Sequence, residues 1–65
     1  MEILLNGAPH SIEQRCTIES LIANLELDGK FAIEINKNIV PRSEYPSTQL
    51  HAGDNIEIVN AIGGG

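Results

Sequence analysis

Apolar and polar residues alternate in three short stretches of the chain, and this period of two predicts strands with one face turned to a core. The stretches are residues 1–6, 31–36 and 56–59. Their predicted core-facing residues are Ile3, Leu5, Phe31, Ile33, Ile35, Ile56 and Ile58. We therefore expect these three stretches to belong to one sheet with a covered face.

A tight turn follows the first stretch. The dipeptide Asn6-Gly7 favours the positive φ angles of a two-residue hairpin. Residues 10–13 are then predicted to return antiparallel to the first strand. Pro9 lacks a backbone donor and marks the start of this returning strand, at an edge of the sheet.

In the second half of the chain, two turns and one irregular or helical segment are predicted to separate the strands. Lys37-Asn38 predicts a turn, after which residues 39–40 form a short strand that Pro41 ends. Residues 42–47 are predicted to be an irregular loop or a single helical turn. Residues 52–54 are a turn signal before the last strand.

One amphipathic helix is predicted between the hairpin and the second stretch. Thr17 supplies a hydroxyl N-cap, and Glu19 places negative charge in the first turn. Asp28-Gly29 is expected to stop the helix. The apolar residues with helical spacing are Ile18, Leu21, Ile22 and Leu25.

The order of these elements indicates an α+β fold. A mixed, curled sheet of four to five strands with one main helix on a single face is the ubiquitin-like β-grasp arrangement. This topology leaves room for the first and last strands to pair in parallel at the centre of the sheet. We expect one domain over residues 1–61 and a flexible glycine tail over residues 62–65.

Charge and composition exclude several classes of function. Nine acidic residues against four basic ones give a net charge of −5, which disfavours nucleic-acid binding. The acidity either suits a basic protein partner or merely aids solubility. No apolar run reaches the length of a membrane span, and no leader sequence is evident, so we expect a soluble, cytoplasmic protein. With one cysteine, neither an internal disulfide nor a cysteine-rich metal site can form.

The last three residues are Gly63, Gly64 and Gly65. Glycine enters narrow spaces in conformations that other residues resist, so such a tail can be threaded through an enzyme channel to present its carboxylate. The alternative is a frayed end without function, which chain termini commonly are.

The chain resembles the ThiS family, the sulfur carriers of bacterial thiamine biosynthesis. The resemblance spans essentially all 65 residues and rests on Asn6-Gly7, residues 35–36 and 39–45, Gly53-Asp54 and Gly64-Gly65. The Val-Pro-Arg segment that ends at Arg42 is its most discriminating part. The third glycine is a departure, because Gly63 stands where relatives often have a larger residue.

The resemblance implies a carrier that is not itself an enzyme. A ubiquitin-activating-type adenylyltransferase that uses ATP and magnesium would adenylate the Gly65 carboxylate, and a persulfide sulfurtransferase would supply the sulfur. The resulting thiocarboxylate would donate sulfur to thiazole synthase. The carrier itself would hold no cofactor or metal, and we expect it to be a monomer when free.

Two other classes of protein also end in two glycines. The small subunit of molybdopterin synthase is also a sulfur carrier, and a ubiquitin-like modifier would form isopeptide bonds with lysines. An interaction module with an incidental glycine tail is the third possibility. Covalent conjugates would indicate the modifier, whereas indifference to loss of Gly64 and Gly65 would indicate the interaction module.

A partner surface can be placed by strand alternation. Leu4, Glu57 and Val59 are expected on the open face of the sheet, and Leu4 and Val59 become neighbours if the first and last strands pair. An apolar pair rimmed by glutamates is suited to docking on an enzyme with an apolar spot and cations. Arg42 either contacts a partner or simply solvates the loop after Pro41.

The remaining reactive side chains are assigned structural or surface roles. Cys16 precedes the N-cap and is expected to pack on Leu21, the arrangement known as a hydrophobic staple. A thiol near a helix start can also accept sulfur as a thiolate, which is the alternative for Cys16. His10 and His51 are isolated from any plausible nucleophile and are expected on the surface.

Overall fold

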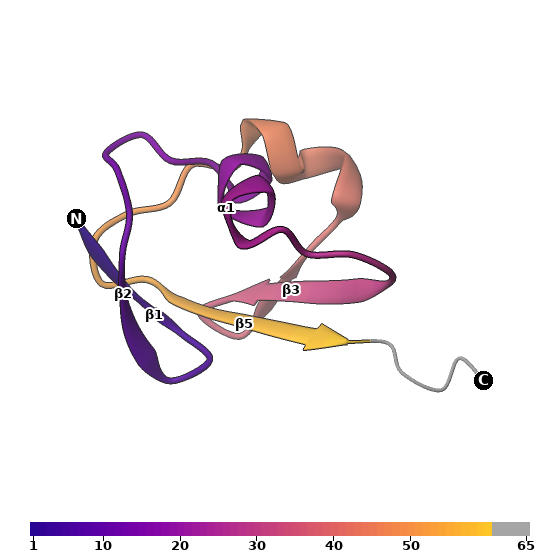
Figure 1. The fold of residues 1–65 in the computed structure, drawn as a ribbon, viewed down its shortest axis with the longest axis horizontal. Helices are drawn as coiled ribbons and strands as arrows, with labels where there is room; N and C mark the ends of the chain where they lie inside the picture. Colours follow the sequence, from indigo (N-terminus) through magenta and orange to yellow (C-terminus); the bar gives the residue numbers. More distant parts are fainter. Residues whose placement is uncertain (61–65) are drawn as a thin grey trace.

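The computed structural model describes residues 1–60, and Figure 1 shows a single sheet crossed on one face by a helix. The strands lie in the order β2-β1-β5-β3-β4. This arrangement confirms the predicted α+β fold of the β-grasp type. The elements are β1 (Glu2–Leu5), β2 (Ala8–Ser11), α1 (Ile18–Leu25), β3 (Phe31–Ile35), β4 (Asn38–Val40), the 3-10 helix η1 (Arg42–Ser47) and β5 (Asn55–Asn60).

The last strand, β5, occupies the centre of the sheet. It pairs in parallel with β1, where Leu4 lies opposite Asn55, and this confirms the predicted pairing of the first and last strands. On its other side β5 runs antiparallel to β3 along its whole length, from Ile35 opposite Ile56 to Phe31 opposite Asn60. Strand β5 is therefore held on both sides over its first residues, and by β3 alone at Asn60, the last described residue.

The first hairpin contains the predicted turn, but its second strand is formed by other residues than predicted. Asn6 and Gly7 have φ angles of 51° and 85°, as a two-residue turn of this kind requires. Because the turn contains only these two residues, β2 begins at Ala8 and ends at Ser11 rather than spanning residues 10–13. Pro9 lies within β2, which is an edge strand as predicted.

The turn between β3 and β4 lies one residue earlier than predicted. Asn36 and Lys37 have positive φ angles, and Asn38 already pairs with Ile35. The Asn36 side chain fixes this position, because its Oδ1 accepts the Asn55 N–H at 3.0 Å and its Nδ2 donates to Asp54 at 3.2 Å. The sequence-based prediction of Lys37-Asn38 missed this long-range anchor.

Helix α1 begins as predicted and ends earlier. The Thr17 hydroxyl accepts the Ser20 N–H at 3.1 Å, which confirms the N-cap. The helix ends at Leu25 rather than at Asp28-Gly29, because Glu26 adopts the left-handed conformation with a φ of 54°. The N–H groups of Glu26 and Leu27 then bond back to Ala23 and Ile22, the double closure of a Schellman motif.

The core lies between α1 and the covered face of the sheet. Ile3, Ile33 and Ile56 from three adjacent strands are fully buried, as the alternation predicted. The segment after η1 also contributes, because Leu50 is buried and its N–H donates to the carbonyl of Cys16 at 2.8 Å. The buried residues are Ile3, Cys16, Ile18, Leu21, Ile33, Tyr45, Leu50 and Ile56.

Candidate functional site

The candidate site is the end of β5, from which the glycine tail continues. Gly63, Gly64 and Gly65, predicted to be threaded and modified, lie outside the described residues, as does the predicted boundary between residues 61 and 62. What the structure describes is the base of the tail. There Asn60, the last residue of β5, pairs with Phe31 of β3.

Asn6 anchors the base of the tail from the other side. Its backbone N–H donates to the Ile56 carbonyl at 2.8 Å, and its side-chain oxygen accepts the Ile58 N–H at 2.8 Å. Strand β1 ends at Leu5, and the Asn6 side chain extends the hydrogen bonding to β5 by two residues, from Ile56 to Ile58. Sequence reasoning treated Asn6 only as a turn residue, because no local pattern signals a bond to a residue so distant in the chain.

The open face of the sheet carries the predicted partner residues in a different arrangement. Leu4 and Val59 are 39% and 52% exposed, as expected for the face away from α1. They are not neighbours, because Leu4 lies opposite Asn55 while Val59 lies opposite Ala32. Four residues of β5 separate the two positions, about 13 Å at roughly 3.3 Å per residue. The prediction of an adjacent Leu4–Val59 pair was therefore wrong.

A row of side chains across β5, β3 and β4 lies between those two positions. Glu57 faces Glu34, and Glu34 in turn faces Ile39. Ile39 is 72% exposed, more than any other large apolar residue in the part of the chain that the structure describes. Sequence reasoning missed Ile39 as a surface residue because its strand is too short to show an alternating pattern. Together with Val59, these residues form what we call the open-face patch: Glu34, Ile39, Glu57 and Val59.

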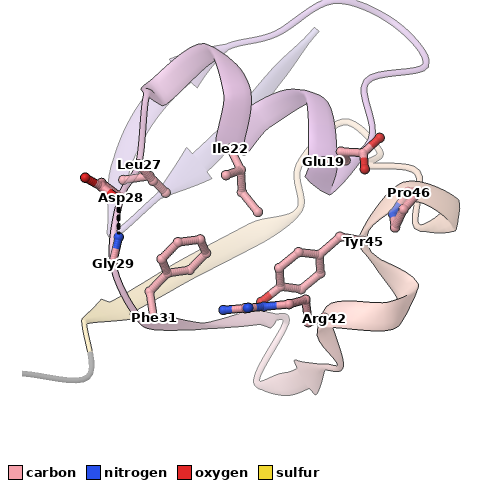
Figure 2. Close-up of a pocket in the computed structure, with 9 residues that line it drawn as sticks. All are labelled: Glu19, Ile22, Leu27, Asp28, Gly29, Phe31, Arg42, Tyr45 and Pro46. Atoms are coloured by element: carbon pink, nitrogen blue, oxygen red, sulfur yellow. Dashed lines mark hydrogen bonds between the residues drawn. The ribbon is translucent and has the colours of Figure 1, made fainter. Parts of the chain in front are cut away.

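Arg42 lies away from the open-face patch. It is the first residue of η1 and lines a hollow on the α1 side of the sheet, together with Tyr45 and Phe31. Figure 2 shows its side chain extending along the hollow, on the side where Tyr45 and Phe31 also line it. The structure therefore separates Arg42 from the other three predicted partner residues, which share the opposite face.

The Cys16 thiol is placed for packing rather than for sulfur transfer. Only 7% of the residue is exposed, and it belongs to the same buried cluster as Leu21, in agreement with the staple interpretation. Burial raises the pKa of the Cys16 thiol, and the negative charge of Glu13 raises it further. Both effects disfavour the thiolate that an attack on a persulfide requires.

The histidines are separated and have different surroundings. His51 is 77% exposed, and its Nδ1 lies 3.9 Å from the Asp54 carboxylate. His10 is half-buried in the edge strand β2, opposite Ile3. Within residues 1–60, no three His, Cys, Asp or Glu side chains are grouped to hold a metal ion. Nor does any helix in this range have the length and apolar character needed to cross a bilayer.

The mixed five-stranded sheet, its single helix and the central last strand define a small ubiquitin-like β-grasp protein. The chain belongs to the ThiS family, which matches residues 3–65.

Known relatives agree with this family assignment, and a solved structure has the same fold. The sulfur carrier protein ThiS of Bacillus subtilis is 42% identical, over 75% of this chain and 76% of its own length. A thiazole synthase of Magnetococcus marinus is 44% identical over the whole of this chain. The crystal structure of the thiamine biosynthesis protein ThiS from Geobacter metallireducens has the same fold, with a TM-score of 0.87, 23% identity and full coverage of both chains.

The thiazole synthases differ from this chain in size. The chain spans about a fifth of the length of the Magnetococcus marinus protein and of a second thiazole synthase, from Paramagnetospirillum magneticum. In both proteins a segment similar to this chain is thus part of a much longer polypeptide.

Proposed function

We propose that this protein is a sulfur carrier of thiamine biosynthesis and that its working group is the carboxylate of Gly65. The observation that carries the proposal is the family match, which extends over the tail as far as residue 65. The Bacillus subtilis sulfur carrier supports the same role. The chain acts as a co-substrate of partner enzymes rather than as an enzyme.

The chemistry begins with activation, because a carboxylate has no good leaving group. Attack of a Gly65 oxygen on the α-phosphate of ATP, bound with magnesium by an adenylyltransferase, releases pyrophosphate and leaves an acyl adenylate. The terminal sulfur of a sulfurtransferase persulfide then attacks the acyl carbon and AMP leaves. A thiol reductant supplies two electrons to split the resulting acyl disulfide, which leaves a thiocarboxylate on Gly65.

The proposed receiver of the sulfur is a thiazole synthase. Support comes from the two relatives of that name, each of which contains a segment similar to this chain. A carrier and an enzyme joined in one polypeptide are held at high local concentration. A separate carrier instead needs a docking surface and a tail that enters the enzyme.

The open-face patch is the proposed docking surface. Exposed Ile39 and Val59 offer apolar contact, while Glu34 and Glu57 are complementary in charge to cations on the partner. Val59→Asp is expected to weaken binding to the partner without unfolding the domain, because the side chain is already half exposed. Leu4→Asp tests the far end of the same face. Unchanged affinity in both variants would remove this surface from the proposal.

The deciding experiment is mass spectrometry of the intact protein. The native chain is first weighed to establish that Gly65 is its last residue, and it is then incubated with an adenylyltransferase, MgATP and a persulfide donor. Fragment ions must locate the change, because oxidation of Met1 or Cys16 adds nearly the same mass as exchange of oxygen for sulfur. A shift confined to the Gly65 fragment supports the carrier, and an unmodified terminus with active partners contradicts it.

A matched variant separates the two candidate sulfur acceptors. Cys16→Ser should gain the same mass at Gly65 as the unaltered protein. Loss of sulfur in this variant, with the fold intact by circular dichroism, would transfer the role to the thiol. Covalent attachment of Gly65 to lysines of other proteins would indicate a ubiquitin-like modifier instead.

A further inference from the structure

Asn6 and Gly7 are the only asparagine–glycine pair in the 65-residue chain, and they form the whole turn between β1 and β2. Both residues are exposed to water. Asparagine is a chemically labile residue, and a following glycine has no side chain to shield its backbone nitrogen. A Cβ placed on Gly7 would lie more than 4 Å from every described residue except its chain neighbours. The turn is therefore open to a covalent change at Asn6.

The reaction is deamidation. The Gly7 nitrogen gives up its proton and attacks Cγ of Asn6, which closes a succinimide ring. The side-chain amide takes up a proton and leaves as ammonia. Water then opens the ring: attack at the side-chain carbonyl gives aspartate, whereas attack at the main-chain carbonyl gives isoaspartate, whose backbone runs through the side chain and is longer by a methylene group. The only co-reactant is water.

The fold turns the reacting carbon away from its nucleophile. Strand β1 lies between β2 and β5, and the Asn6 side chain is directed to β5, where its Oδ1 accepts the Ile58 N–H at 2.8 Å. The chain leaves Asn6 through Gly7 in the opposite direction, towards β2. The side chain must rotate about its Cα–Cβ bond to reach the Gly7 nitrogen, and this rotation breaks the hydrogen bond to Ile58. The reaction is therefore confined to molecules in which that bond is open.

We propose that Asn6 is a deamidation site controlled by its hydrogen bond to Ile58, and that the isoaspartyl product releases β5 from the β1–β2 turn. An aspartate at this position keeps both the acceptor oxygen and the length of the turn. Isoaspartate lengthens a turn of only two residues and moves the acceptor, so the Ile58 N–H loses its partner. The inference goes beyond the proposed function, because none of its steps involves sulfur transfer.

Asn36 is a control that the chain itself supplies. Its φ angle is 50°, against 51° for Asn6, and its side-chain oxygen also accepts an N–H of β5, from Asn55 at 3.0 Å. It is followed by Lys37, whose side chain shields the backbone nitrogen. Its amide nitrogen also donates to the Asp54 carboxylate at 3.2 Å, which holds the leaving group in place. We expect Asn6 to deamidate faster than Asn36 by about tenfold or more.

The test is mass spectrometry of peptides from the full-length protein after incubation at mildly alkaline pH. Trypsin cleaves after lysine and arginine, which leaves Asn6 as the only asparagine of peptide 1–15 and Asn36 as the only one of peptide 31–37. Replacement of NH2 by OH shifts the peptide mass, and fragment ions distinguish Asn6 from Gln14. Methylation by an isoaspartate methyltransferase identifies the isoaspartyl form. Equal rates in the two peptides would contradict the proposal.

Control by the Ile58 bond is tested by comparing deamidation with amide hydrogen exchange. Both processes require the bond to be open, so the two rates should rise together as urea is added below the unfolding transition. In the fully unfolded chain Asn6 should react faster than in the folded protein by about fivefold or more. Equal rates in the folded and unfolded protein would overturn this control, as would an Asn6 rate that stays constant while Ile58 exchange accelerates.

Release of β5 is tested on the isoaspartyl protein, purified by chromatography. Its Ile58 amide should exchange with solvent faster than the same amide in Asn6→Asp. That variant is the matched control, because it carries the same added charge on an unaltered backbone. Equal exchange of the Ile58 amide in the two proteins would contradict the release of β5.

Discussion

The side-chain oxygen of Asn6 accepts a hydrogen bond from the backbone N–H of Ile58 at 2.8 Å, across 52 positions of sequence. The same residue has a φ of 51° and forms the first position of the β1–β2 turn. Asn is one of the few residues other than glycine that adopts this conformation readily. One side chain thus shapes a hairpin and secures the strand that leads to the tail.

The two roles of Asn6 can be separated by substitution. Asn6→Gly keeps the turn but removes the hydrogen bond, and should lower the free energy of unfolding by about 1 kcal/mol. Asn6→Ala also forces alanine into the left-handed region, which adds roughly 1 kcal/mol. Asn6→Asp retains an acceptor and serves as the control. Urea denaturation that ranks alanine no lower than glycine would contradict this division.

Glu26 offers a stabilising change. It closes α1 in the left-handed conformation, where a side chain is strained and glycine is favoured. Glu26→Gly should therefore raise the free energy of unfolding by about 0.5 kcal/mol or more. The matched control is Glu19→Gly, the same chemical change inside the first turn of α1, which should lower it by about 1 kcal/mol. Thermal denaturation should shift in opposite directions for the two variants.

The facing glutamates of the open-face patch make a third prediction. Glu34 and Glu57 lie directly opposite each other in the β3–β5 ladder, and like charges in that relation are destabilising. Glu57→Gln should raise the free energy of unfolding by about 0.2–1 kcal/mol at low salt. The gain should shrink as salt screens the pair in the unaltered protein.

The control for this change is Glu2→Gln at an exposed position of β1, where no facing carboxylate exists in the described ladder. The free energy of unfolding of the Glu2→Gln variant should equal that of the unaltered protein. If Glu57→Gln also weakens partner binding, then Glu57 contributes to docking even though it repels Glu34 within the carrier. A stabilised variant with full affinity would leave Glu57 outside the interface.

The strands and the N-cap could be predicted because their signals are local. Alternation fixed the faces of Ile3, Ile33 and Ile56, and the Thr17 hydroxyl needs only the next turn of the chain. The element ends were less predictable. Glu26 ended α1 early by entering a conformation that favours glycine, whereas Gly29, the residue expected to stop the helix, lies beyond it.

The candidate site was harder to predict because it depends on register. Alternation correctly assigned Leu4 and Val59 to one face, but their separation follows from which residues of β1 and β5 are paired. A shift along the strands leaves the faces unchanged when it is by an even number of residues. The position of Arg42 in the hollow on the α1 side of the sheet depends on how η1 packs on α1, which no periodicity in the sequence reveals.

The buried thiol predicts a pH dependence of stability. Folding raises the pKa of Cys16 above its ordinary value of 9.0, through burial and the charge of Glu13. Below that value the thiol is protonated in both the folded and the unfolded state, so it contributes no pH dependence to the free energy of unfolding. Above it the unfolded chain loses the proton while the folded protein keeps it, and stability falls as pH rises towards the folded pKa.

The measurement compares the unaltered protein with Cys16→Ala by urea denaturation from neutral pH to about pH 10, a range set by the ordinary pKa values of Cys and Tyr. All other ionisable groups are common to the two proteins, so the difference between the two curves isolates the thiol. We expect that difference to be flat below the ordinary thiol pKa. Above it, the stability advantage of the cysteine protein should decline by at most about 1.4 kcal/mol per pH unit. A flat difference throughout would mean that Cys16 ionises as easily in the folded protein as in the unfolded chain, and would reopen its candidacy as a sulfur acceptor.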